Sequence, residues 1–171
     1  MEKRYSGWLF LIGVAGLVIA ADQISKGVVV ARLSINHAIP VIDGFFNIVH
    51  VQNPGGAFGF LADQDSRVRP FLFMIGSVAA VGMLIYLFTR MHPGTRLFSL
   101  GIALILGGAF GNMIDRLRLG SVIDFLDFYI GNLHWPAFNV ADSSVSVGCG
   151  ILILQMLMNP KAGNTHIRSS H

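Results

Sequence analysis

Residues 97–116, LFSLGIALILGGAFGNMIDR, decide the fold of this chain. Their first 18 residues carry no charge, and Asp115 and Arg116 follow directly. A helix needs about 20 apolar residues to cross the hydrocarbon core of a bilayer. A helix of this length on a soluble protein would show a polar face, which this stretch lacks. The stretch therefore predicts a membrane-spanning helix that ends in charged residues at the membrane surface.

Small residues recur at every fourth position of this span, at Ala103, Gly107 and Gly111. Such a small-xxx-small series lets another helix approach closely. Further along, Asn112 shares a face with Gly108 and with Asp115 and Arg116. We therefore expect the polar end of this span to pack against polar groups of another span.

Three further uncharged stretches of similar length lie at 5–21, 71–89 and 143–160. We predict an all-α membrane protein, one integral membrane domain over residues 1–171, with four transmembrane helices. The four expected spans lie near 7–29, 70–89, 97–116 and 138–158. The first could instead be a cleaved signal peptide, because basic residues precede it and Ala20-Ala21 resembles a cleavage site. Its apolar run exceeds the usual length and more spans follow, so we interpret it as an anchor.

The density of basic residues predicts the orientation. Segments 1–6, 90–96 and 159–171 hold six Lys and Arg residues with one acid, whereas the longer remainder holds six with eight aspartates. The raw counts are tied, so only density favours both termini in the cytoplasm. We expect segments 30–69 and 117–137 to lie outside. Residues 46–52 alternate imperfectly and have turn residues on both sides, which predicts a small β element on the outer surface.

Four aspartates fall at the outer ends of spans: Asp22, Asp115, Asp124 and Asp142. No apolar span separates Asp115 from Asp142, so Asp124 and Asp142 must lie at the same membrane face. Two adjacent carboxylates do not easily both ionise, so one holds a proton while the other stays charged. Such a pair can activate water against an amide without metal, cofactor or covalent intermediate.

Other interpretations of these aspartates remain open at this point. Asp142 could simply charge the positive end of the fourth helix, and Asp22 with Lys26 four residues later predicts an ion pair that orients the first helix. We expect Asp43, Asp63, Asp65 and Asp127 to be surface charges. A proton conductor or a structural subunit packed through small residues are alternative classes. The acids gather at one face with none mid-span, which disfavours conduction.

Other kinds of site find little support. The histidines have no zinc-binding spacing and the one cysteine, Cys149, permits no internal disulfide. Ser143 or Ser144 with His134 could form a nucleophile and base, but no Gly-x-Ser-x-Gly turn surrounds them. The formal charge of +3 comes without a basic run, so we expect no nucleic acid as a partner.

Five motifs in order resemble those of the lipoprotein signal peptidases, also called signal peptidase II, over nearly the whole chain. They are DQISK at 22–26, NPGGAF at 53–58, GGAFGNMIDR at 107–116, VIDF at 122–125 and FNVADS at 138–143. The resemblance implies a membrane aspartic endopeptidase with a β cradle and an interfacial helix. It implies that Asp124 and Asp142 are the catalytic pair. The residues implied to shape the pocket are Asn53, Gly55, Asn112, Arg116, Asn139 and Ala141. From its place beside Arg116 at the end of the third span, we expect Asp115 to support the site.

The family resemblance also implies partners and a location. The substrate is a diacylglyceryl prolipoprotein, cut just before its lipidated cysteine, and inhibitors of the globomycin type block the reaction. The implied location is the bacterial inner membrane, in contact with its lipid. One departure is visible: Pro54 and Gly56 stand where the family usually has a small polar residue and an alanine. This departure touches the turn near Asn53 and neither aspartate.

Overall fold

The computed structural model describes residues 2–55, 68–90 and 96–158, and four long helices dominate these ranges. They are α1 (Glu2–Arg32), α2 (Val68–Arg90), α3 (Arg96–Leu119) and α4 (Val140–Met158). Each is long and apolar enough to cross a membrane. The four helices expected from the sequence are present. α1 begins five residues before its expected span and ends three after it, and α3 ends three residues after its expected span.

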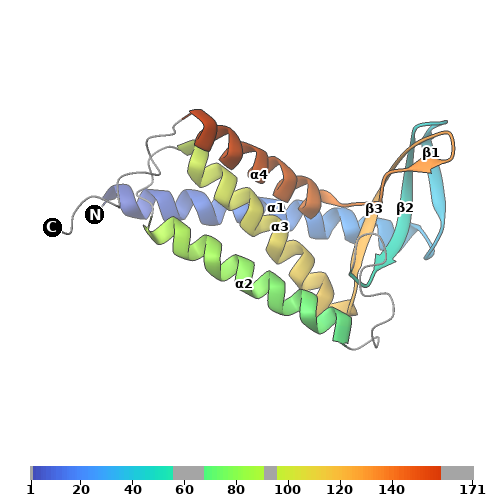
Figure 1. Ribbon diagram of the computed structural model, residues 1–171. Helices are drawn as coiled ribbons and strands as arrows, with labels where there is room; N and C mark the ends of the chain where they lie inside the picture. The colour runs from blue at the N-terminus through green and yellow to red at the C-terminus, as the bar shows by residue number, and fades with distance from the viewer. Residues whose placement is uncertain (1, 56–67, 91–95, 159–171) are drawn as a thin grey trace.

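α3 is the central helix and packs against the other three (Figure 1). A Cβ on Gly107 would lie 2.7 Å from the Cβ of Val18 in α1. On the neighbouring face, a Cβ on Gly108 would collide with the carbonyl oxygen of Ala141 in α4. The predicted close approach of helices is therefore confirmed. Gly107 allows α1 to approach α3 closely, and Gly108 does the same for α4.

A four-stranded antiparallel sheet stands at one end of the helices (Figure 1). Its strands run in the order β1 (Ala38–Ile42), β2 (Phe46–Asn53), β3 (Val122–Ile130) and β4 (Leu133–His134). The β element expected in segment 30–69 is confirmed, but half of the sheet comes from segment 117–137, where we expected none. The described part of segment 30–69 holds no separate interfacial helix, and residues 56–67 lie outside the described residues.

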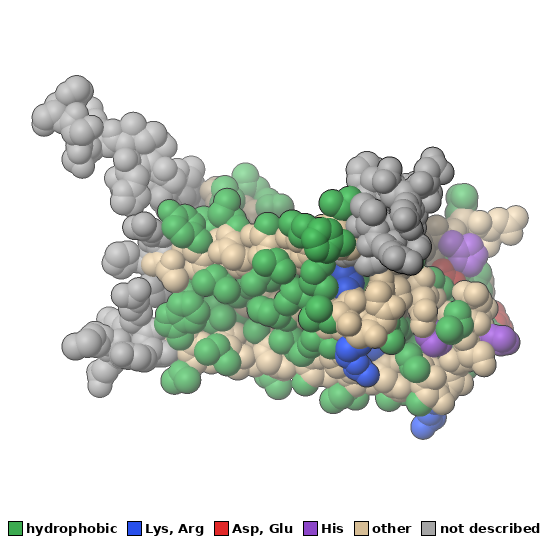
Figure 2. Space-filling view, turned by 90° about the horizontal axis from the view of Figure 1, so that it is seen from below, with side chains coloured by type: hydrophobic (Ala, Val, Ile, Leu, Met, Phe, Trp, Pro, Cys, Tyr) green, Lys and Arg blue, Asp and Glu red, His purple; other side chains and the backbone are tan. Residues whose placement is uncertain are grey.

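Polarity divides the molecule along its length. α1 begins and α4 ends at the end of the bundle opposite the sheet (Figure 1). A core of buried side chains from α1, α2 and α3 fills the bundle: Leu11, Val81, Phe88, Ile102, Ala103 and Leu106. Figure 2 shows hydrophobic side chains over the helices, whereas the charged and histidine side chains in view gather toward the sheet. The buried polar groups described next lie where the helices meet the sheet.

Candidate active site

Asp124 and Asp142 come together where the sheet meets the bundle. Asp124 lies in β3 with 2% of its surface exposed, and Asp142 lies in the first turn of α4. The strand reaches α4 because residues 125 and 126 pair with Phe138, just before the helix begins. The sequence placed both aspartates at one membrane face, and the structure brings them into one polar cluster.

Asn139 connects the two carboxylates. Its side chain caps α4, because Oδ1 accepts a hydrogen bond from the backbone N–H of Asp142 (2.9 Å). The amide is then oriented with Nδ2 toward β3, and it donates to Oδ1 of Asp124 at 2.7 Å. Asn139 is fully buried, so each of its polar atoms must find such a partner. One amide thus fixes Asp124 relative to the start of α4.

Asn53, at the end of β2, holds the other oxygen of Asp124. Its Nδ2 donates to Oδ2 of Asp124 (3.0 Å), while its Oδ1 accepts from the backbone N–H of Gly55 (2.9 Å). Gly55 has φ +99°, a conformation that favours glycine, and a Cβ there would collide with the ring of Phe73. The turn after β2 therefore sets the orientation of the Asn53 amide.

Asn112 in α3 serves Asp142 in the same way. Its Nδ2 donates to Oδ1 of Asp142 at 2.8 Å. Its Oδ1 accepts from Nζ of Lys26 (2.9 Å) and from Nδ2 of Asn139 (3.2 Å). An ammonium can only donate, so Lys26 fixes which end of the Asn112 amide faces Asp142.

Lys26 is buried, at 2% exposure, between two carboxylates. Its Nζ lies 2.8 Å from Oδ2 of Asp22 and 2.8 Å from Oδ2 of Asp115. Asp22 also accepts from the backbone N–H of Ala141 (3.0 Å), and Asp115 from that of Ile123 (3.2 Å). The predicted ion pair is present, but it lies inside the molecule and joins α1 to α3, α4 and β3.

Two neighbours of this network were not singled out from the sequence. Gln23 donates to the carboxylates of Asp22 (3.2 Å) and Asp115 (2.9 Å). Phe73 of α2 lies against Gly55 on one side, and the guanidinium of Arg116 lies 5.8 Å from its ring centroid. Gln23 stands beside Asp22 in the DQISK motif, a signal that could have found it; Phe73 sits in an uninterrupted apolar span and carries none.

The electrostatics of the site bring the pKa of one carboxyl close to neutral pH. Burial is the largest cause that raises the pKa of Asp124, and the charge of Asp142 adds to it. The hydrogen bonds from Asn53 and Asn139 oppose this rise, and the net pKa is about 6. An aspartate whose pKa lies in this range can gain and lose a proton at the pH of a cell.

The serine alternative and one surface assignment are not supported. The hydroxyls of Ser143 and Ser144 donate to carbonyl oxygens of Asn139 and Val140 in their own helix, both at 2.9 Å. His134 instead lies 2.8 Å from Asp127.

Asp127 itself was expected at the surface and is buried, at 7% exposure, and Asn47 and His134 bind its carboxylate. Asp43 is exposed as predicted, and Asp63 and Asp65 lie outside the described residues.

Comparison with known proteins agrees with this geometry. The family model described as "Signal peptidase (SPase) II" matches residues 14–158, which include α4 and every polar residue of the cluster. The chain belongs to the signal peptidase II family. It is therefore a multi-pass membrane peptidase of the aspartic class.

Individual members of the family are similar over most of their length. The lipoprotein signal peptidase of Desulforapulum autotrophicum is 46% identical over 146 residues, covering 85% of this chain and 90% of the relative. That of Syntrophus aciditrophicus is 44% identical, covering 90% of this chain and 94% of the relative. A solved structure titled "Bacterial membrane enzyme structure by the in meso method at 2.3 A resolution" matches with a TM-score of 0.78 and 30% identity, covering 94% of both chains.

Proposed function

We propose that the chain removes signal peptides from diacylglyceryl prolipoproteins, using Asp124 and Asp142 as a water-activating pair. The observation that carries this proposal is that Asn139 binds both carboxylates, the buried one of Asp124 through its side-chain amide and the partly buried one of Asp142 through its backbone N–H. Capping alone would need Asp142 only at the start of α4. The buried carboxylate of Asp124 binds the amide that caps α4, and the charge of Asp142 raises the pKa of Asp124. Two carboxyl groups that influence each other's ionisation are typical of a proton-transferring pair.

The reaction divides the work between a charged and a protonated carboxyl. The charged aspartate takes a proton from water as the water oxygen attacks the scissile carbonyl carbon. The protonated aspartate donates a hydrogen bond to the carbonyl oxygen, which gains negative charge. When the C–N bond breaks, a proton passes to the leaving nitrogen. Asn53, Asn112 and Asn139 hold the carboxylates in place by donating to them.

The remaining support residues act at the edges of this pair. Gly55 and Arg116 meet at Phe73, beside Asn53, and would shape the pocket wall. Ala141 is fully buried against α3 and α1, and its N–H binds Asp22. Asp115, Asp22 and Lys26 form the ionic support beneath Asn112. We assign no substrate contact to these last three residues.

The substrate and location follow from family membership. We propose a diacylglyceryl prolipoprotein as the substrate, cut just before its lipidated cysteine, in the bacterial inner membrane. Basic residues are densest in segments 1–6, 90–96 and 159–171, which favours cytoplasmic termini with the site near the outer face. A site at the lipid boundary suits a substrate whose acyl chains stay in the leaflet.

The test is cleavage of a diacylglyceryl prolipoprotein by the purified protein in lipid, with and without globomycin. We expect cleavage before the modified cysteine, lost on adding globomycin. The same prolipoprotein without its diacylglyceryl group is the matched control, and we expect it to be left intact. Equal cleavage of both forms would contradict the assigned substrate, and no cleavage of either would contradict the function.

A further inference from the structure

Asp22 of α1 binds the backbone of α4 directly beside the candidate pair. Its Oδ1 accepts a hydrogen bond from the N–H of Ala141 (3.0 Å), the residue before Asp142. Asp22 is fully buried, and it fits there because α3 has no side chain at Gly111: a Cβ at that position would lie 2.6 Å from Oδ2 of Asp22. The start of α4 is therefore tied to α1 by a carboxylate that packs directly on α3.

Asp115 of α3 makes the equivalent contact with β3. Its Oδ2 accepts a hydrogen bond from the N–H of Ile123 (3.2 Å), the residue before Asp124. Asp115 is also buried. Both aspartates of the candidate pair thus have the same kind of support, because a second, buried carboxylate binds the N–H of the residue that precedes each of them.

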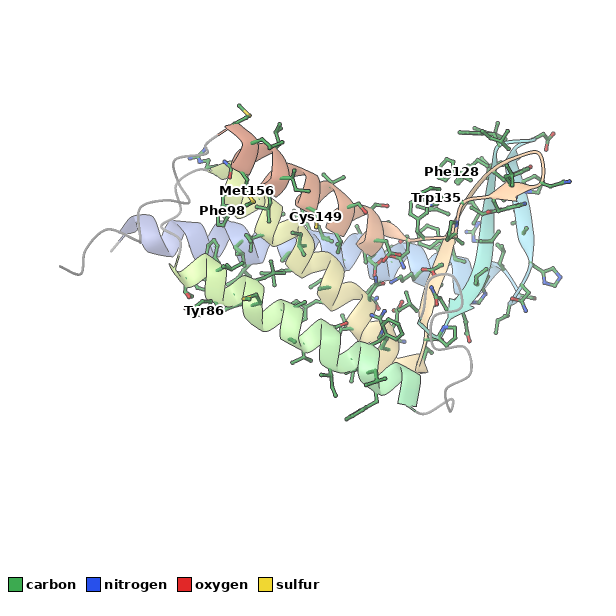
Figure 3. The ribbon with its side chains drawn as sticks, in the orientation of Figure 1. Tyr86, Phe98, Phe128, Trp135, Cys149 and Met156 are labelled. Atoms are coloured by element: carbon green, nitrogen blue, oxygen red, sulfur yellow. The ribbon has the colours of Figure 1, made fainter. Side chains whose placement is uncertain are left out.

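Two side chains of α1 join these supporting carboxylates to each other. Nζ of Lys26 lies 2.8 Å from Oδ2 of Asp22 and 2.8 Å from Oδ2 of Asp115. Nε2 of Gln23 donates to Oδ2 of Asp22 (3.2 Å) and to Oδ1 of Asp115 (2.9 Å). Figure 3 shows oxygen and nitrogen atoms of side chains gathered where the helices meet β3. We name this set the aspartate clamp: Asp22, Gln23, Lys26 and Asp115.

The aspartate clamp is a costly way to stabilise a fold. Two buried carboxylates share one ammonium, and apolar residues of similar volume are often as stable as a buried ion pair. What the clamp supplies is a fixed distance between two backbone N–H groups, those of Ile123 in β3 and Ala141 in α4. Catalytic groups need such a fixed distance, because a displacement of about 1 Å can cost about 10²-fold in rate.

We propose that the aspartate clamp sets the separation between Asp124 and Asp142, with Gln23 and Lys26 as the positioning residues that span it. This inference rests on the proposed function, in which the two aspartates share one proton. Their separation matters because the repulsion that keeps one carboxyl protonated while the other is charged weakens with distance. Both carboxyl groups must also reach the same water molecule and the same amide bond.

Gln23→Leu tests the clamp without changing any charge. Leucine is apolar and cannot bridge the two carboxylates. For cleavage of a diacylglyceryl prolipoprotein in lipid, we expect kcat to fall about 10–10²-fold with KM unchanged. The bell-shaped pH dependence of kcat should become narrower, because its two midpoints belong to the coupled pair and approach each other as the carboxyl groups move apart. The charged groups around the pair all stay in place: Asp22, Lys26, Asp115 and Arg116.

Two further variants keep the test sharp. Gln52→Leu is the matched control, because Gln52 is exposed in β2, and it should keep the wild-type rate and pH profile. Gln23→Asn shortens the bridge by one methylene, so that its amide cannot bind both carboxylates. It should narrow the pH profile as Gln23→Leu does, and it gives the same test if Gln23→Leu does not fold.

The outcomes separate the clamp from the proposed function. If the wild-type protein cleaves and Gln23→Leu matches it in kcat and in the width of the pH profile, the clamp does not set the separation. A lower unfolding temperature with an unchanged profile width would also overturn the proposal, since Gln23 would then support only the fold. No cleavage by the wild-type protein at any pH would instead overturn the proposed function, and the clamp proposal with it.

Discussion

Asn139 and Asp142 bind each other reciprocally at the start of α4. The backbone N–H of Asn139 donates to Oδ2 of Asp142 (3.2 Å), and the N–H of Asp142 donates to Oδ1 of Asn139 (2.9 Å). This is the geometry of a capping box, which satisfies free N–H groups at a helix start. Here the same cap places one carboxylate of the candidate pair and, through Nδ2, holds the other.

The cap and the donor function of Asn139 can be separated by substitution. Asn139→Ser keeps an oxygen that caps the helix but removes the donor to Asp124, whereas Asn139→Ala removes both. We expect Asn139→Ala to lose about 0.5–2 kcal/mol of stability from the cap in addition to the loss shared by both variants. Both should lose cleavage to a similar extent. Thermal unfolding in detergent and a cleavage assay check this, and a Ser variant with normal turnover would refute the donor role.

Neutral replacement of either aspartate should stop the reaction without unfolding the protein. Asp124→Asn and Asp142→Asn each remove a carboxyl that must exchange a proton, so turnover should fall by about 10²–10⁴-fold or more. Asp43→Asn is the matched control, because Asp43 is exposed in the turn between β1 and β2, and it should cleave normally. Near-normal turnover by either site variant would exclude the pair as the catalytic groups.

The rate of cleavage should depend on pH through Asp124. Its pKa is raised by burial to about 6, so the charged form is lost as pH falls through that value. If Asp124 is the base, kcat/KM should decline on the acid side with a midpoint near 6 instead of near 4. Cleavage measured across pH with a lipidated substrate gives the midpoint, which belongs to the coupled pair as a whole.

Asn53 offers a signed control for this pH dependence. Its hydrogen bond stabilises the charged form of Asp124 and so lowers the pKa of that carboxyl. Asn53→Ala should therefore move the acid midpoint to higher pH. A fall in rate with the midpoint unchanged, or moved to lower pH, would show that Asn53 does not act on the carboxylate that titrates.

Much of the fold was predictable because lipid imposes simple rules. An apolar run of bilayer length can only be a span, so all four helices were placed within a few residues. The strand Val122–Ile130 was missed although its β-branched and aromatic residues, followed by Gly131-Asn132, are typical of a hairpin. Asp124 and Asp127 fall on opposite faces of the strand, so neither face shows the purely apolar alternation that indicates a half-buried strand.

The residues of the candidate site were predictable from the sequence, but the contacts between them were not. Topology required Asp124 and Asp142 to share a face, and the motifs selected Asn112 and Asn139. Lys26 shows the limit. Its spacing from Asp22 predicted a pair within one helix, but its contacts with Asp115 and Asn112 span 86 or more residues of chain. Contacts of this separation depend on helix packing, which local spacing cannot give.

Lys26 should affect both stability and turnover, through different partners. Lys26→Met leaves Asp22 and Asp115 buried without their cation, and breaking such a buried pair costs about 3–5 kcal/mol. Lys26→Met/Asp22→Asn removes one charge of each sign and should recover part of that stability. Turnover should stay low in both variants, because Asn112 has lost the ammonium that orients it toward Asp142. Wild-type turnover by the double variant would reduce Lys26 to a charge partner only.

Gly108 marks where α3 and α4 approach most closely beside the site, and a methyl group there should push them apart. The Cβ of Gly108→Ala would collide with the carbonyl oxygen of Ala141, a backbone atom that cannot turn away. Overpacking of this kind costs about 1–3 kcal/mol, which exceeds the gain of up to about 1 kcal/mol from better helix propensity. Gly82→Ala in α2 is the control, since its Cβ would meet nothing within 4 Å. Unfolding in detergent should show Gly108→Ala destabilised and Gly82→Ala unchanged or stabilised. Cleavage should fall only in Gly108→Ala, because Ala141 is the residue directly before Asp142; equal behaviour of the two variants would mean that this contact does not position the site.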